Sequence, residues 1–209
     1  MNRLEKTILA ITGGAHLSVH ALMLALPSLI PILMSEFNIG LDILGLIVTI
    51  SAFMFGFGAI PSGWMENKIG GRTLLILYLF TSSFSALLVS ISNSFYHLVF
   101  GLGLLGLSSS IYHPAGLTLI SNRVHQITKG MAVHGIFGST GSAIGPILAT
   151  TLAFLISWRA SYATLGVFNF VLGIASLLLI PSDDNINDVE INWNHEVLKA
   201  REYQIKNLN

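Results

Sequence analysis

Long stretches without a Lys, Arg, Asp or Glu residue dominate the chain. They cover residues 7–35, 43–65, 73–122, 130–158 and 160–182. A helix needs about 20 apolar residues to cross the hydrocarbon core of a bilayer. The stretch 73–122 is too long for one crossing, and its polar cluster Ser92-Asn93-Ser94 marks a turn. The pattern therefore predicts an all-α, polytopic membrane protein whose six transmembrane helices cover residues 8–34, 42–65, 73–92, 96–121, 130–156 and 160–180.

The composition supports a membrane protein. The chain has 209 residues, of which 53% are hydrophobic and only 10% are charged, whereas soluble domains carry about 25% charged residues. A soluble fold of this length could not bury so much apolar surface, so the surplus must face the lipid bilayer. The net charge of zero argues against nucleic acid as a partner, and the absence of cysteine excludes disulfides and thiolate metal sites.

The positions of the ten Lys and Arg residues predict the orientation. With six crossings and both ends in the cytoplasm, nine of the ten lie on the cytoplasmic side and only Arg159 lies outside. Such a split follows the positive-inside rule. We therefore expect a multi-pass protein of the cell (inner) membrane with a cytoplasmic N-terminus and C-terminus. Residues 1–181 form the six-helix bundle, and residues 182–209 form a polar cytoplasmic tail that holds six of the ten acidic residues.

Charge returns in one short segment, GWMENKIGGR, between the helices predicted at 42–65 and 73–92. The segment is similar to the signature loop of the major facilitator superfamily, which reads roughly G-x-L-x-D-R-x-G-R-R. Asn67 stands at the family's aspartate and Gly71 at one of its basic positions. The resemblance implies a loop that holds the cytoplasmic ends of helices together and releases them during conformational change. The residues that we assign to this loop are Gly63, Glu66, Asn67, Lys68, Gly70 and Arg72.

Three further motifs extend the resemblance to about residues 8–181. Gly141, Gly145 and Pro146 form a G-x-x-x-G-P motif in the helix predicted at 130–156, and Ser157-Trp158-Arg159 opens the next helix as in the family. Small residues at such spacing also simply let two helices pack closely in lipid. The sequences YHPAG at 112–116 and HGIFG at 134–138 resemble the fosmidomycin-resistance type of exporter within the superfamily.

The resemblance to this superfamily implies an architecture and a function. Its transporters have two six-helix bundles, each a 3+3 inverted repeat, and the solute binds between them. The chain corresponds to the first bundle, and its tail corresponds to the central linker. We expect secondary active transport of a small organic solute, as proton-coupled efflux, with a second six-helix bundle supplied by a homodimer or a separate chain. The alternative is a truncated, non-transporting membrane remnant or an assembly partner.

Asp42 stands at the very start of a predicted helix, and histidines are the ionisable residues at depth in the predicted helices. His16 and His20 share a helix face because they are four residues apart, and His113 precedes Pro114. From a rise of 1.5 Å per residue, His16 and His113 lie about 12 Å from the cytoplasmic helix ends, His20 about 18 Å and His134 about 6 Å. Such residues usually face a cavity or a partner. They are candidates for binding solute or relaying protons, for hydrogen bonds between helices, or for binding a metal.

We expect neither a metal nor a cofactor, because a metal transport site would more often place a carboxylate or thiol beside the histidines. We also expect no enzyme. Gly106-Leu107-Ser108-Ser109 resembles the nucleophile motif of intramembrane serine proteases but lacks the glycine that usually follows the serine, and no H-E-x-x-H is present. The aromatic residues near the predicted helix ends suggest interfacial anchors, namely Trp64, Tyr96, Trp158 and Tyr162.

Overall fold

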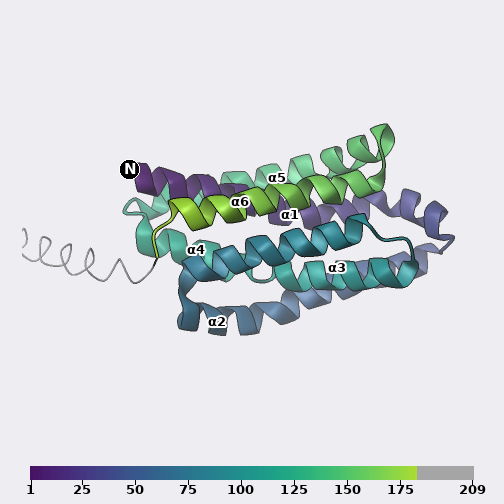
Figure 1. Cartoon of the computed structure of the whole chain (residues 1–209), viewed down its shortest axis with the longest axis horizontal. Coiled ribbons are helices and arrows are strands. Elements are labelled where there is room, and N and C mark those ends of the chain that lie inside the picture. The colour runs from purple at the N-terminus through teal and green to yellow at the C-terminus, as the bar shows by residue number, and fades with distance from the viewer. Residues whose placement is uncertain (183–209) are drawn as a thin grey trace, which may run out of the picture.

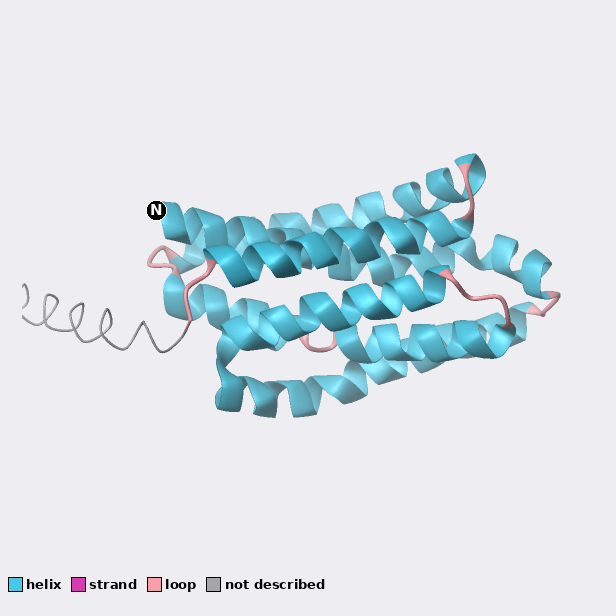
Figure 2. Cartoon of the chain, viewed as in Figure 1, coloured by secondary structure: helices cyan, strands magenta, loops and turns pink. Residues whose placement is uncertain are grey.

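The computed structural model describes residues 1–182 of the chain, and it builds them from helices joined by short connections (Figures 1 and 2). The predicted tail falls almost wholly outside these described residues. The connections alternate between the two ends of an elongated bundle, as six antiparallel crossings require. The helices are α1 (Arg3–Phe37), α2 (Leu41–Ser90), α3 (Phe95–Ser109), α4 (Tyr112–Arg123), α5 (Ile127–Leu155) and α6 (Trp158–Leu179).

The helix α2 supplies two of the predicted crossings. It contains 50 residues, about 75 Å of helix at 1.5 Å per residue, whereas the hydrocarbon core is about 30 Å thick. Its backbone leaves the helical region at Gly70, where φ is 76° and ψ is 158°. The chain reverses there, so the two parts of α2 lie antiparallel (Figure 1). The helices predicted at 42–65 and 73–92 are therefore both present, but they are joined by a sharp turn rather than a loop.

The helix predicted at 96–121 is broken in its middle. Two residues, Ser110 and Ile111, separate α3 from α4, and Figure 2 shows this break as a short loop inside the bundle. Pro114 explains the position, because a proline ring clashes with the carbonyl four residues earlier and cannot donate a hydrogen bond to it. That carbonyl belongs to Ser110. By length and composition, five helices of the described residues could cross a membrane, with residues 95–123 counted as one helix and α2 counted once.

Helix α1 packs most extensively against α5, and α2 packs against α3 and α6. The α1–α5 contact depends on glycines that face α1. A Cβ atom at Gly145 would lie 2.5 Å from the Cα of Ala21, and one at Gly141 would overlap the backbone of Leu17. The G-x-x-x-G part of the predicted motif is therefore a close helix contact, which agrees with its packing interpretation.

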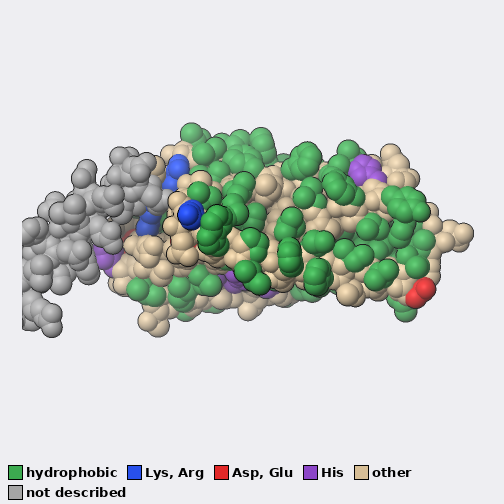
Figure 3. Space-filling view, turned by 90° about the horizontal axis from the view of Figure 1, so that it is seen from below, with side chains coloured by type: hydrophobic (Ala, Val, Ile, Leu, Met, Phe, Trp, Pro, Cys, Tyr) green, Lys and Arg blue, Asp and Glu red, His purple; other side chains and the backbone are tan. Residues whose placement is uncertain are grey.

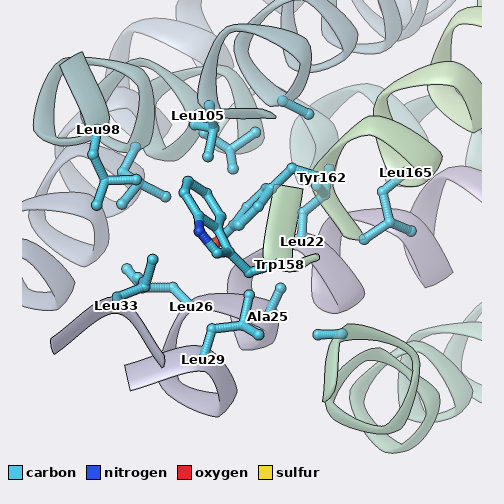
Figure 4. Close-up of a cluster of buried hydrophobic side chains, with 14 of the residues drawn as sticks. Leu22, Ala25, Leu26, Leu29, Leu33, Leu98, Leu105, Trp158, Tyr162 and Leu165 are labelled. Atoms are coloured by element: carbon cyan, nitrogen blue, oxygen red, sulfur yellow. The ribbon is translucent and has the colours of Figure 1, made fainter. Parts of the chain in front are cut away.

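An apolar core lies where α1, α3 and α6 meet, and Trp158 and Tyr162 lie inside it (Figure 4). Both side chains are buried, with 2% and 0% of their surface exposed. The prediction that they anchor the protein at the membrane surface is therefore wrong for these two residues. Trp64 and Tyr96 are exposed, at 63% and 82%, as an anchor at the interface requires.

Charges gather at the two ends of the bundle. On the face in Figure 3, Lys and Arg side chains lie near the end that holds the N-terminus, and an acidic side chain lies near the other end. The single cation predicted outside, Arg159, pairs with Glu36 at 2.6 Å. It also donates a hydrogen bond to the carbonyl oxygen of Ser92 at 2.6 Å. This end of the bundle therefore joins α1, the α2–α3 connection and α6 through one arginine.

Candidate functional site

Four histidines from three helices form one cluster in the bundle. His16 and His20 come from α1, His113 from α4 and His134 from α5. The rings of His16 and His134 stack with their centroids 3.9 Å apart. The ring of His113 packs edge-on against His16 at 5.3 Å and against His20 at 5.8 Å. The structure thus brings together all four histidines that the sequence singled out.

His134 lies at the same level as His16, although the predicted depths differed. The prediction placed the start of the helix at residue 130, but α5 begins at Ile127. The helix α1 also begins earlier than predicted, at Arg3 rather than residue 8, so the helix starts do not give the relative depth of the two residues. The stacking of the two rings, with centroids 3.9 Å apart, shows that they lie side by side.

The hydrogen bonds of the cluster determine which ring nitrogen carries the proton in His16 and in His20. The Nδ1 atom of His16 lies 2.8 Å from the carbonyl oxygen of His134. A carbonyl can only accept, so the Nδ1–H of His16 donates and its Nε2 carries a lone pair when the ring is neutral. The Nε2 of His20 lies 3.1 Å from this Nε2, and therefore donates to it. Two neighbouring imidazoles are thus arranged as a short chain of donors and acceptors.

Tyr112 is a member of this cluster that the sequence prediction missed. Its side chain is buried, and its hydroxyl donates to the carbonyl oxygen of Thr12 at 2.5 Å. The same hydroxyl lies 3.3 Å from Nδ1 of His134, and the ring stacks on His16 with centroids 5.2 Å apart. The signal that could have found it is its place directly before His113, at the break that Pro114 causes.

The cluster has a buried side and a reachable side. His16 and His134 are 8% and 5% exposed, whereas His20 and His113 are half-buried. Phe55 of α2 packs edge-on against His113 at 6.0 Å. Two rings are therefore held in the protein, and two can meet a solute, a proton carrier or an ion. No Asp or Glu side chain lies among the contacts described for these rings.

The predicted signature loop holds the end of α6. Arg72 donates from Nε to the carbonyl oxygen of Ile180 at 2.7 Å and from Nη2 to that of Leu177 at 3.2 Å. These carbonyls lack helical partners because they belong to the last turn. Arg123 donates to the next carbonyl, that of Pro181, at 2.8 Å. The end of α6 at Leu179 is therefore tied to both loops by arginines.

The other residues of the loop make local contacts. The Nζ atom of Lys68 lies over the Trp64 ring, 5.1 Å from its centroid, and Asn67 donates to the carbonyl oxygen of Gly63 at 3.1 Å. Glu66 forms no hydrogen bond or ion pair with the described residues. A Cβ at Gly71 would lie 3.1 Å from backbone atoms of α4, which explains why a basic side chain of the family pattern is replaced by glycine.

The serine segment of α3 packs against α2. Ser108 donates to the carbonyl oxygen of Leu104 at 2.7 Å and lies 3.0 Å from the hydroxyl of Ser85. A Cβ at Gly106 would overlap the backbone of Ser51. These contacts bring α2 and α3 close together through hydroxyl groups and small residues.

Comparison with curated proteins finds relatives of low identity, several of which are transporters by name. An uncharacterised transporter of Buchnera aphidicola subsp. Acyrthosiphon pisum is 23% identical over 98% of this chain and 50% of its own length. The inner membrane transport protein YnfM of Escherichia coli K12 is 23% identical over 80% of this chain and 41% of its own. The quinolone resistance protein NorB of Staphylococcus aureus JH9 is 23% identical over 84% and 38%. The chain thus spans about half the length of these relatives, or less.

Solved structures share the fold. A peptide transporter POT in complex with sulfate superposes with a TM-score of 0.72 at 12% identity, over 96% of this chain and 45% of its own. The POT family transporter PepTSo gives a TM-score of 0.71 at 17% identity, over 85% and 37%. The helical bundle is therefore one that occurs within larger membrane transporters.

The family model described as "Major Facilitator Superfamily" matches residues 11–201, which is most of the chain. It covers the histidine cluster, the α2 turn and the glycine motif of α5. Together with the helical fold and the transporter relatives, this match confirms the resemblance that the loop motif indicated. The chain belongs to the Major Facilitator Superfamily.

Proposed function

We propose that the chain acts as one bundle of a two-bundle secondary transporter and moves a small organic solute out of the cell in exchange for protons. The observation that carries this proposal is the match of a single six-crossing bundle to larger transporters of the same superfamily. In such proteins the solute binds between two bundles that rock against each other. The name of one relative, a quinolone resistance protein, agrees with outward transport.

The second bundle comes from another copy of this chain or from a separate chain. The relatives are about twice as long as the matched region, so alternating access needs a second bundle of comparable size. The bundle lies in the inner membrane with both termini in the cytoplasm, as the distribution of Lys and Arg indicates. The name of the Escherichia coli relative, an inner membrane protein, supports this location.

The histidine cluster is the site that contacts the solute or relays protons in this proposal. His20 and His113 form its reachable side, and His16 and His134 form its buried side. Histidine changes its charge near neutral pH, which suits a proton carrier. The signature loop and the glycines of α5 serve the conformational change, with Arg72 holding the end of α6. The resemblance of YHPAG and HGIFG to the fosmidomycin-resistance type of exporter makes fosmidomycin a first solute to test.

The test is proton-coupled flux in inside-out membrane vesicles from cells that express the full chain. The vesicles are energised, a quinolone or fosmidomycin is added, and proton release is followed with a pH-sensitive dye. We expect release above that of empty vesicles, and a loss of at least tenfold in His16→Ala and His113→Ala, because either change removes a ring from the cluster. The control is His97→Ala, which lies in the first turn of α3 at the other end of the bundle. Unchanged flux in both cluster variants would remove the histidine mechanism.

A second candidate function is a membrane protein that does not transport by itself, either a remnant or an assembly partner. The observation that favours it is the match to only about half of each relative. It predicts a monomer in mild detergent and no flux in the vesicles. A dimer that also shows flux would exclude this candidate.

A further inference from the structure

Three of the histidines present one ligand atom each to a common point. Ring nitrogens of His16, His20 and His113 all lie within 4.8 Å of one another. From this geometry we propose that these three residues bind a divalent transition-metal ion of the Zn²⁺ class. Metal binding is the least expected of the three roles considered for these histidines, because no carboxylate or thiol stands beside them in the sequence. Three neutral imidazoles are nevertheless a sufficient ligand set for zinc.

The distance between the first two ligands already fits a metal. A zinc–nitrogen bond of about 2.0–2.1 Å and a tetrahedral angle place two ligand nitrogens about 3.4 Å apart. The Nε2 atoms of His16 and His20 lie 3.1 Å apart. The ion would take the place of the proton that these two nitrogens share. The ligand nitrogen of His113 lies no more than 4.8 Å from the other two, so it needs to approach by at most about 1.4 Å to reach the same spacing. His113 is only half-buried and comes from the start of α4.

His16 has the environment of a metal ligand. Ligating histidines almost always donate their other ring N–H to a carbonyl or carboxylate, which orients the ring and fixes the tautomer. The Nδ1 of His16 makes this bond to the carbonyl oxygen of His134 at 2.8 Å, so Nε2 is free to bind. The stacked ring of His134 and the ring of Tyr112 hold the imidazole in position from the buried side.

The chemistry of the ligands selects the class of ion. Imidazole nitrogen suits Zn²⁺, Co²⁺, Ni²⁺ and Cu²⁺, whereas Mg²⁺ and Ca²⁺ need oxygen ligands. Three protein ligands leave a fourth position open for water or for an anionic donor. The half-exposed side of His20 and His113 provides that opening. Because no carboxylate balances the charge of the ion, we expect micromolar rather than nanomolar affinity.

The experiment measures metal binding to the purified full chain in detergent, prepared without a histidine tag. Co²⁺ is titrated and its visible absorption is recorded, and Zn²⁺ is then added to displace it. We expect intense bands of a four-coordinate site that Zn²⁺ abolishes. His20→Gln and His113→Gln should each weaken Co²⁺ binding at least tenfold, because each removes a ligand. His97→Gln is the matched control and should bind as the unchanged chain does.

Two results would overturn the proposal. One is the absence of four-coordinate bands at 1:1 Co²⁺ with protein at about 100 µM, far above a micromolar dissociation constant. The other is binding that survives both His20→Gln and His113→Gln. A normal size-exclusion profile shows that each variant is folded, and both chosen residues are half-buried so that their replacement leaves no cavity in the core. Transport is not measured, so the outcome is independent of the proposed function.

Discussion

Gly141 shows how a single hydrogen atom in place of a side chain sets the contact between two helices. Its Cα faces the backbone of Leu17, and the next glycine of the motif, Gly145, faces Ala21. In lipid, water supplies no drive for two helices to associate, so close packing must supply it. The contact of α1 with α5 also positions His16 against His134. Packing and the candidate site therefore depend on the same glycines.

Replacing Gly141 with alanine should lower the thermal stability of the detergent-purified protein. The added methyl group overlaps the backbone of Leu17, and overpacking of this kind costs about 1–3 kcal/mol. Gly135→Ala, in the same helix, is the control because a Cβ there meets no atom within 4 Å. Equal melting temperatures for the two variants would show that the close contact does not exist.

Glu5 carries the clearest pH-dependent contribution outside the predicted crossings. Its carboxylate accepts hydrogen bonds from the backbone N–H of His125 at 2.9 Å and from the side chain of His125 at 2.6 Å. The backbone N–H bond is the main cause that lowers the pKa of Glu5 from 4.5 to about 2, and burial partly opposes it. Because the folded pKa is the lower one, Glu5 stabilises the folded protein above about pH 4.5, and this stabilisation is lost as the pH falls toward 2.

We therefore expect Glu5→Gln to unfold at a lower temperature than the unchanged chain at pH 7. The difference between the two should shrink as the pH is lowered from 4.5 toward 2. Thermal unfolding at a series of pH values measures it, with Glu66→Gln as the control, since Glu66 has no hydrogen bond or ion pair with the described residues. A difference that stays constant, or that grows on acidification, would contradict the assignment.

At the scale of elements, the reversal of α2 is made by one residue. Gly70 has φ 76° and ψ 158°, a region that only glycine enters without strain. The turn brings Arg72 to the end of α6 and Gly71 against α4. The charged segment of the sequence thus serves as a tight corner that joins three helices at one end of the bundle.

Replacing Gly70 with alanine should destabilise the protein by about 1–3 kcal/mol, the usual cost of such a backbone conformation for other residues. Gly63→Ala is the matched control, because Gly63 lies in the helical part of α2 and a Cβ there meets no atom within 4 Å. Thermal unfolding in detergent compares the two. If Gly63→Ala were the more damaging change, the corner would not lie at Gly70.

The crossings could be predicted from sequence because charges interrupt the apolar stretches, except between α2 and α3, where the uncharged polar cluster Ser92-Asn93-Ser94 marks the turn. The break between α3 and α4 was less visible, since its residues are uncharged and only Pro114 marks it. The burial of Trp158 and Tyr162 could not be predicted either. In sequence, a tryptophan near a helix end fits the membrane interface as well as it fits the protein core. Only the packing of α1 and α3 around Trp158 shows that it belongs to the core.

The histidines of the candidate site could be found because ionisable groups are rare in apolar helices. The contact among the four histidines in one cluster could not be predicted. Only His16 and His20 could be paired, because their spacing of four residues places them on one helix face. The orientation of His16 depends on a backbone carbonyl of α5, and no side-chain pattern records a carbonyl. The place of Tyr112 in the cluster could not be predicted for a similar reason, because its hydroxyl donates to a backbone carbonyl of α1.

At the scale of the whole molecule, the chain is a bundle with two chemically distinct ends and a histidine cluster between them. Arg72 and Arg123 tie α6 at the end near the N-terminus, and Arg159 ties α1 and α6 at the other end. The proposed transport function presupposes that the bundle crosses the membrane with the arginine-rich end in the cytoplasm. The absence of cysteine from the chain allows this to be measured without background.

The direct measurement is labelling of single cysteines with a maleimide that cannot cross membranes. The cells are stripped of their outer membrane and wall, and their inner membrane is left intact. Asn93→Cys lies in the α2–α3 connection and Gln126→Cys lies between α4 and α5, and both positions are exposed. We predict that Asn93→Cys reacts in intact cells and that Gln126→Cys reacts only after lysis, because an odd number of crossings separates them. Equal labelling of both positions in intact cells would contradict the six-crossing bundle and the transport function built on it.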